Sequence, residues 1–149
     1  MKLEEELKQK EFQSIHERLG VNLIFTNNWL MPKLRAFFQE YEITHAQYNI
    51  LRILRGQHPN PVPISLLIER MIFKQSDVSR LVDRLYAKNL VDRRICSKDR
   101  RKMDVLISDE GLALLAQIDA PLIARQKEIL GNLSETDIRQ LNNLLDKLR

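Results

Sequence analysis

The chain has 149 residues, of which 44% are hydrophobic and 30% are charged, and its formal net charge is +4. It holds no apolar run near the roughly 20 residues of a membrane span, its charged start lacks the apolar stretch of a signal peptide, and its one cysteine excludes an internal disulfide framework. We therefore expect a cytoplasmic protein, and the abundance of Leu, Ile, Lys, Arg and Glu beside few Gly and Pro predicts that it is mainly helical.

The N-terminal part is expected to form a helix from residue 3 to about residue 41, because its apolar residues recur with helical period. Gly20 and Pro32 are the expected places for a kink or break. Acidic and basic residues near its start have the four-residue spacing of stabilising ion pairs, namely Glu4 with Lys8 and Glu6 with Lys10.

The sequence Thr44-His45-Ala46-Gln47 matches a capping box, so a second helix is expected from there to about Arg55. The residues from Gly56 to Pro63 form a loop, within which Val62 can form a short strand. A short helix from Ile64 to Met71, a turn over 72–75 and a helix ending near Lys88 follow. Two helices joined by a short turn are typical of a helix-turn-helix.

Two strands are predicted next, from Val91 to Cys96 and from Lys102 to Ile107, with the loop 97–101 between them. In the second strand, Met103, Val105 and Ile107 alternate with more polar residues, which indicates a half-buried strand. A helix-turn-helix followed by such a hairpin is a winged helix. The expected fold class is therefore mainly α with a small β-hairpin wing.

The remaining chain is expected to form two helices. Ser108 can cap the first, which continues to about Leu130 with a kink at Pro121, and the sequence 134–137 opens the second. An apolar stripe runs along the last helix, formed by Ile138, Leu141, Leu144, Leu145 and Leu148. We interpret residues 1–41 and 112–149 as dimerisation helices that pack together and against a second subunit, and residues 42–111 as a DNA-binding lobe.

Positive charge is concentrated in the middle of the chain. Between Arg70 and Lys102 there are eleven Lys or Arg and four Asp, a net charge of +7, whereas the whole chain carries +4 and the remainder therefore −3. A basic block on a helix and a hairpin, in an otherwise mildly acidic protein, favours nucleic-acid binding.

The helix that follows residue 75 has two different faces. Its apolar face is formed by Val78, Leu81, Val82 and Leu85, and its polar face by Ser76, Ser79, Arg80, Asp83 and Arg84. Arg can pair with guanine in the major groove, and a serine hydroxyl can donate or accept there. The alternative is an ordinary solvated face, but its position beside a basic hairpin favours DNA reading.

The loop between the strands carries four basic residues around one carboxylate, namely Lys98, Arg100, Arg101 and Lys102 around Asp99. A thin basic loop can enter the minor groove, where negative potential attracts arginine. Asp99 would fix the direction of an arginine side chain, or it is a plain turn residue. Both roles are compatible.

The run SDVSRLVDRLYAKNLVDRRICSKDRRKMDVLISDEG, from Ser76 to Gly111, resembles the signature of the MarR (multiple antibiotic resistance regulator) family of winged-helix transcription regulators. The likeness lies in V-S-R-L-V-D-R-L, in L-V-D-R, in the D-x-R of the wing and in the exit ending at Gly111. The sequence THAQYNILRIL from Thr44 also resembles the family. Asn89 stands where a glycine is usual, and Asn tolerates the left-handed conformation expected there.

The resemblance implies a homodimer that binds a pseudo-palindromic operator, with the recognition helix in the major groove and the wing arginine in the minor groove. It places Ser76, Ser79, Arg80 and Arg84 on the recognition helix and Asp99 with Arg101 on the wing. Asp83 is expected to orient Arg80. The expected phosphate contacts are Lys74, Gln75 and Lys102.

The resemblance also implies that a small aromatic or anionic effector, or an oxidant, weakens DNA binding. The candidate effector residues are His16, Phe25, Trp29 and Arg35, with Phe38 beside them, and the alternative is that these are ordinary core and surface residues. Cys96 lies near Arg94 and Lys98 in the sequence, which can lower the pKa of its thiol and make it reactive, but the sequence favours the alternative of a bystander thiol.

No metal, cofactor or catalytic site is expected, because the three histidines are scattered and the sequence has no glycine-rich phosphate loop or nucleophile–base arrangement. The leading hypothesis is a sequence-specific regulator, most simply a ligand-responsive repressor. The alternatives are a non-specific or architectural DNA-binding protein and a protein-interaction module, and the dense arginines of the hairpin argue against the latter.

Overall fold

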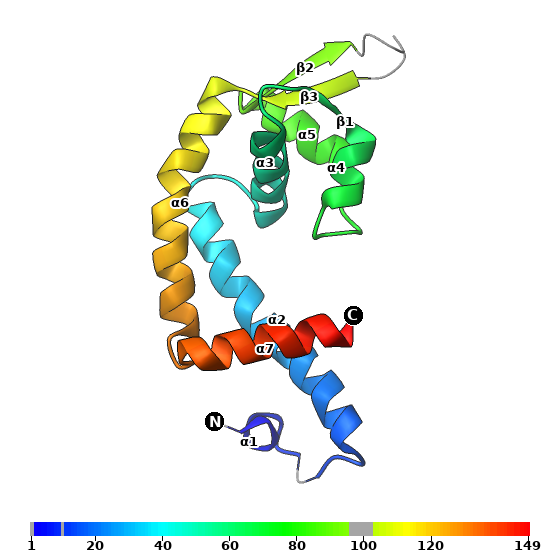
Figure 1. The fold of residues 1–149 in the computed structure, drawn as a ribbon, viewed down its shortest axis with the longest axis vertical. Helices are drawn as coiled ribbons and strands as arrows, with labels where there is room; N and C mark the ends of the chain where they lie inside the picture. The colour runs from blue at the N-terminus through cyan, green and yellow to red at the C-terminus, as the bar shows by residue number, and fades with distance from the viewer. Residues whose placement is uncertain (1, 10, 96–102) are drawn as a thin grey trace. The chain divides into compact units, whose positions relative to one another are not determined.

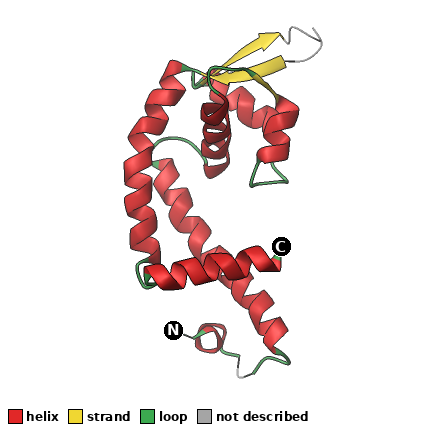
Figure 2. Cartoon of the chain, viewed as in Figure 1, coloured by secondary structure: helices red, strands yellow, loops and turns green. Residues whose placement is uncertain are grey.

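The computed structural model describes residues 2–9, 11–95 and 103–149. It is mainly helical with one small antiparallel sheet, as the sequence predicts (Figures 1 and 2). The chain divides into two compact units, residues 1–36 and 37–149, which are described separately. The elements are α1 (Leu3–Leu7), α2 (Ile15–Gln39), α3 (His45–Gln57), β1 (Val62–Pro63), α4 (Ile64–Arg70), α5 (Val78–Ala87), β2 (Val91–Ile95), β3 (Met103–Ile107), α6 (Asp109–Leu130) and α7 (Glu135–Leu148).

The first unit holds α1 and most of α2, so the prediction of one helix from residue 3 is wrong. The helix ends where Lys8 adopts a left-handed conformation with φ 52°. A new helix starts after Ser14, whose hydroxyl accepts a hydrogen bond from the Glu17 backbone N–H at 3.0 Å. Ser14 and Glu17 have the spacing of a capping box, which favours a new helix start here. This local preference outweighs the ion-pair spacing of Glu4 with Lys8, which favoured one continuous helix.

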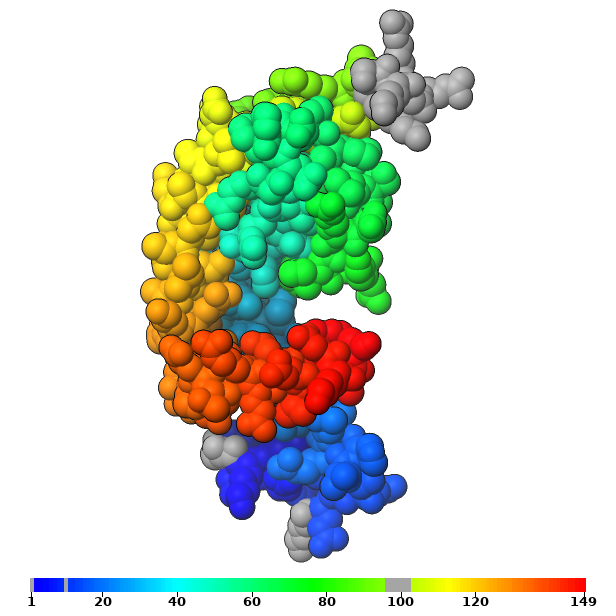
Figure 3. Space-filling model, viewed as in Figure 1, coloured from blue at the N-terminus to red at the C-terminus, as the bar shows by residue number. Residues whose placement is uncertain are grey.

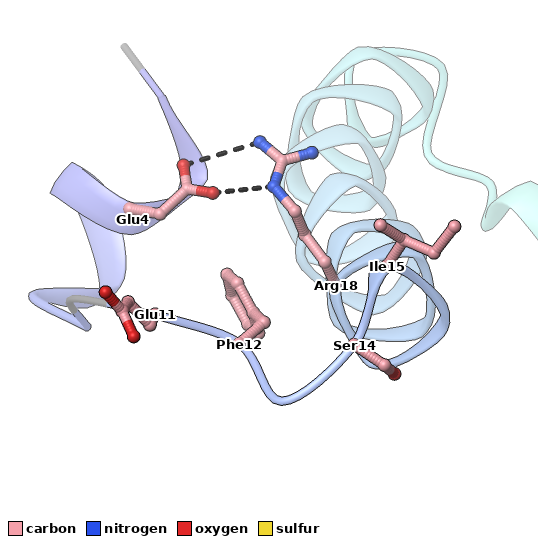
Figure 4. A pocket seen from close by; sticks show the side chains of 6 residues that line it. All are labelled: Glu4, Glu11, Phe12, Ser14, Ile15 and Arg18. Carbon is pink, nitrogen blue, oxygen red and sulfur yellow. Dashed lines mark hydrogen bonds and ion pairs between the residues drawn. The ribbon is translucent and has the colours of Figure 1, made fainter.

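Glu4 pairs with Arg18 across the two helices of this unit. Arg18 donates from Nε to one carboxylate oxygen of Glu4 at 2.6 Å and from Nη2 to the other at 3.4 Å. Figure 4 shows Arg18 reaching from α2 toward α1, with Phe12 of the connecting segment pointing into the hollow between them. The expected pairing of Glu4 with Lys8 is replaced by this non-local contact.

Gly20 and Pro32 both lie inside α2, so neither ends the helix as expected. Proline removes one backbone hydrogen bond and adds a steric clash with the preceding turn. α2 has 25 residues, so the backbone hydrogen bonds before and after Pro32 are retained and the helix continues through Pro32.

The second unit contains a three-stranded sheet in the order β1-β3-β2. Val62 pairs with Val105, which confirms the short strand expected there, and β2 pairs with β3 from Val91–Ile107 to Ile95–Met103. Figure 1 shows α3, α4 and α5 gathered on one side of this sheet. The predicted strand ends Cys96 and Lys102 lie outside the described residues.

The burial of β3 differs from the alternation predicted for a half-buried strand. Val105, Leu106 and Ile107 are all buried, whereas Met103 is 40% exposed. β3 is the central strand of the sheet, and it contacts both α3 and α4. Both faces are therefore covered near Ile107 and open near Met103.

The helix-turn-helix is held by side chains from α4, α5 and the turn between them. Leu67, Met71, Val82 and Leu85 are each no more than 1% exposed. Because apolar burial dominates folding, this cluster fixes α5 against the rest of the lobe. α3 joins α6 through Arg55, which donates to both carboxylate oxygens of Asp119 at 2.7 and 3.1 Å.

A tight corner links α5, β2 and α6. Asn89 is left-handed with φ 57°, as predicted from its tolerance of that conformation. The Ser108 hydroxyl donates to the Asn89 carbonyl at 2.7 Å and accepts from the Gly111 N–H at 3.0 Å, which confirms its role as a helix cap. A Cβ on Gly111 would overlap the Leu90 carbonyl oxygen and lie 2.7 Å from Cγ1 of Ile107.

α6 runs through Pro121. α7 begins after Ser134, as predicted, and the structure shows a capping box between Ser134 and Asp137. The apolar stripe of α7 is largely open: Leu141, Leu144 and Leu148 are between 46% and 55% exposed. The orange and red atoms of α7 face the viewer in Figure 3. No helix within the described ranges is long and apolar enough to cross a membrane.

An aromatic cluster joins the end of α2 to α3 and to the turn before α5. His45 stacks on Phe38 at 4.8 Å between ring centroids and meets Phe73 edge-on at 4.9 Å. Phe38 also contacts Tyr48 at 4.6 Å and is fully buried. Phe38 therefore packs in the core of the lobe, as the alternative of an ordinary core residue predicts.

The free energy of unfolding should fall as the pH drops from about 7.5 to about 5.5, and His45 should cause part of this loss. Burial lowers the pKa of His45 below its usual value, because a charged imidazolium loses hydration there. Below about pH 6.5 the unfolded chain therefore binds a proton that the folded chain resists, and stability is lost. Urea unfolding at both pH values measures the effect.

The control is the exposed His16. His45→Phe should lose less stability on acidification than the wild type, and His16→Gln should lose as much as the wild type. Equal pH dependence of His45→Phe and the wild type would contradict the prediction.

Candidate nucleic-acid interface

α5 presents the two faces that the sequence predicts. Val78, Val82 and Leu85 are buried, whereas Ser79, Arg80 and Arg84 are exposed. The apolar face packs into the lobe, so the hydroxyl and guanidinium groups of the other face are directed to solvent. This is the arrangement in which donors on one helix can approach the edges of base pairs.

α5 begins at Val78, two residues after Ser76, which was predicted to lie on this helix. Asp77 occupies the N-cap position, and Ser76 lies in the preceding turn, half-buried, with its N–H donating to the Phe73 carbonyl at 3.1 Å. The placement of Ser76 on the helix is therefore wrong. Ser and Asp are both good caps, and only one of two adjacent residues can take that place.

Arg80 is held by Asp77 rather than by Asp83. One oxygen of Asp77 accepts from the Arg80 backbone N–H at 3.1 Å, and the other lies 3.3 Å from Nε of its side chain. Asp83 instead pairs with Arg93 of β2, so its expected role toward Arg80 is wrong. Asp77 and Asp83 are each three residues from Arg80, so spacing alone fits both. Asp83 pairs with Arg93 of β2, and Asp77 remains to pair with Arg80.

The turn before α5 carries the exposed side chains of Lys74 and Gln75. Together with Phe73 and Ser76 they line a shallow hollow. The Lys74 ammonium donates to the Glu69 carbonyl at the end of α4. The other expected contacts, Asp99, Arg101 and Lys102, lie outside the described residues, as does the Cys96 thiol.

Asn49 positions this turn and is not among the residues predicted from the sequence. It lies in α3, is 8% exposed, and its Oδ1 accepts from the Ile72 backbone N–H at 2.9 Å. A buried polar side chain without a partner is costly, so its presence inside an apolar run indicates a structural hydrogen bond. The sequence feature that could have identified Asn49 is its position as a polar residue among Tyr48, Ile50 and Leu51.

Asn49→Ala is expected to lower the free energy of unfolding by about 1–3 kcal/mol, because the Ile72 N–H loses its acceptor in a partly buried place. Urea unfolding monitored by circular dichroism measures the change. Asn143→Ala is the control, since Asn143 is exposed on α7, and it should stay within about 0.5 kcal/mol of the wild type. Equal midpoints for the two variants would count against the role of Asn49.

The four candidate effector residues all lie on α2, but they do not share one face. His16, Trp29 and Arg35 are exposed and Phe25 is half-buried. Phe25 and Trp29 are four residues apart and so neighbour each other, whereas Trp29 and Arg35 lie about 120° apart around the helix axis. The cation beside Trp29 is Lys33, whose Nζ lies 5.1 Å from the ring centroid.

Comparisons with known proteins agree with this geometry. Residues 43–103 match the model of the MarR family. The chain is 31% identical over 119 residues to the HTH-type transcriptional repressor MdtR of Bacillus subtilis (strain 168), covering 80% of this chain and 76% of MdtR.

Two solved structures share the fold. A cysteine-to-serine mutant of E. coli MarR, complexed with operator DNA, has a TM-score of 0.79 at 22% identity, covering 93% of this chain and 99% of that one. A structure on the regulation of DNA binding of Bordetella bronchiseptica BpsR by 6-hydroxynicotinic acid has a TM-score of 0.80 at 21% identity, with coverages of 93% and 97%.

A helix-turn-helix with a β-hairpin, in which the second helix turns a serine and two arginines to solvent, defines a winged-helix DNA-binding regulator. With the match to MdtR and to the family model, the chain belongs to the MarR family of transcriptional regulators.

Proposed function

We propose that this protein is a sequence-specific repressor that binds a pseudo-palindromic operator as a homodimer. The observation that carries the proposal is the outward face of α5, where Ser79, Arg80 and Arg84 are exposed, within the basic stretch of the sequence from Arg70 to Lys102. The relative MdtR is a transcriptional repressor. The protein acts in the cytoplasm by binding, not by catalysis.

In this proposal the residues divide by the part of DNA that they contact. Ser79, Arg80 and Arg84 face base edges in the major groove, because only base contacts carry direct sequence information. Lys74, Gln75 and Ser76 of the preceding turn, with Lys102, contact phosphates. Asp99 and Arg101 place the wing at the minor groove.

The dimer would be formed by the terminal helices, residues 1–41 and 112–149. The open apolar stripe of α7 supports this, since exposed apolar surface of that kind marks contacts with another protein. Two copies of α5 would then meet half-sites about one helical turn apart, roughly 10 bp between centres.

The proposed effector is a small aromatic acid that weakens DNA binding. Phe25 and Trp29 offer neighbouring rings on α2, and Lys33 supplies a cation at Trp29. The compound that regulates DNA binding of BpsR, 6-hydroxynicotinic acid, is an aromatic acid of this kind. His16 and Arg35 lie on other sides of the helix and would contribute only from a second element.

Selection from a random pool of DNA duplexes at roughly physiological salt tests the proposal, because non-specific electrostatic binding is weakened there. An enriched inverted repeat is the expected result, with an affinity some 10³–10⁷ times that for unrelated DNA. Binding without enrichment that vanishes as salt rises would overturn the proposal in favour of an architectural DNA-binding protein.

A further inference from the structure

Arg93 connects the wing strand β2 to α5 through two contacts. Its Nη2 forms an ion pair with Oδ1 of Asp83, and its guanidinium lies 4.6 Å from the centroid of the Tyr86 ring. Asp83 and Tyr86 are three residues apart on α5, so they are neighbours on the helix surface. One planar group from the strand therefore holds two side chains of the helix.

The Arg93 side chain is only 28% exposed, although its charge counts toward the basic block. The guanidinium is occupied at one edge by a carboxylate and on one face by an aromatic ring. A guanidinium can make both contacts at once because it is planar and forked, whereas an ammonium cannot. This side chain is therefore committed to the protein and not directed to DNA.

We propose that Arg93 is a positioning residue for DNA recognition: together with Asp83 and Tyr86 it locks β2 to α5, so that the recognition helix and the strand β2 dock on DNA as one unit. The proposal rests on the proposed function. Its physical basis is preorganisation, since two contact surfaces that are already fixed relative to each other lose less freedom on binding.

The sign of the effect at Asp83 separates this proposal from simple electrostatics. Asp83 carries a negative charge on α5 and is 62% exposed. If charge alone mattered, its removal would strengthen binding to a polyanion. If Asp83 holds Arg93, its removal frees the strand from the helix and weakens binding to the operator.

The test compares the dissociation constants of full-length variants for the selected operator duplex. Asp83→Asn and Arg93→Lys should each weaken binding about three- to tenfold, the scale of one partly exposed ion pair with a cation–π contact. The double variant should be no weaker than either single variant, because both break the same unit. Tyr86→Leu should act in the same direction.

Asp92→Asn is the matched control, since it removes the same charge from an exposed position next to Arg93. It should bind as tightly as the wild type or more tightly. Wild-type affinity in Arg93→Lys, or unchanged or tighter binding in Asp83→Asn, would overturn the proposal, because Arg93 would then act only through its charge.

A second measurement on the free protein keeps failure of the inference distinct from failure of the proposed function. Amide hydrogen exchange in β2 should be several-fold faster in Asp83→Asn and Arg93→Lys, and unchanged in Asp92→Asn. Unchanged exchange in all three overturns the inference even where an operator is bound. If no duplex is selected at all, the proposed function fails, while exchange still reports whether Arg93 joins strand and helix.

Discussion

Replacing Arg80 by alanine should weaken operator binding by about 1–3 kcal/mol and relax the preference at one base position. The side chain of Arg80 is 79% exposed in the first turn of α5, and Asp77 holds both its backbone N–H and its Nε. A guanidinium fixed in this way is preorganised for a bidentate bond to guanine. Only a guanine at that position can then form both hydrogen bonds with the Arg80 guanidinium.

Dissociation constants for the operator and for a set of single-base variants measure the effect. Arg139→Ala is the control, because Arg139 is 80% exposed on α7 and its ion pair with Glu135 is long, at 3.9 Å. It removes the same charge at a distance from α5 in the sequence and should leave the order of preferred bases unchanged. An equal loss on every duplex by Arg80→Ala would show a phosphate contact instead.

Replacing Gly111 by alanine should lower the free energy of unfolding by about 3 kcal/mol, near the upper end for overpacking of a core. The new Cβ would overlap the carbonyl oxygen of Leu90 and crowd the side chain of Ile107. The first obstacle is backbone, which cannot rotate away as a side chain can. The corner that joins β2 to α6 would have to open.

Gly20→Ala is the matched control, because the residue lies inside α2 and, apart from its chain neighbours and the helix's own backbone, no atom of the described residues lies within 4 Å of the added Cβ. It should raise the free energy of unfolding by about 0.4–1 kcal/mol, since alanine loses less backbone freedom on folding than glycine. Thermal and urea unfolding measure both variants. Equal stability of the two would contradict the close approach at Gly111.

Local signals predicted much of this fold. The capping boxes at Thr44 and Ser134, the cap at Ser108 and the left-handed turn at Asn89 each involve residues within a few positions of one another. The geometry of such motifs can be predicted from the sequence, because the hydrogen-bond partner of each backbone group is only a few residues away in the chain. The same holds for the two faces of α5, which follow from helical period alone.

The errors arose where two local signals compete or where the deciding contact is distant. Ser14 and Glu17 have the spacing of a capping box at the start of α2, but charge spacing before Ser14 and apolar periodicity after it suggested an unbroken helix. Ser76 and Asp77 can both cap α5. The partner of Asp83 is ten residues away on a strand, and the hydrogen bond from Ile72 to Asn49 spans 23 residues. Neither sequence separation follows from the repeat of a helix or a strand, so neither contact can be predicted from local periodicity.

α5 keeps the residues that fold the lobe apart from those that face solvent. Val78, Val82 and Leu85 are buried, and Ser79, Arg80 and Arg84 contribute nothing to that core. Descendants of one gene could therefore exchange the outward residues and acquire new operators while inheriting the same fold. Asp83 would be the constrained member of the outward face, since a change there also releases the wing strand. Divergence of regulators after gene duplication would proceed most readily through the three positions 79, 80 and 84.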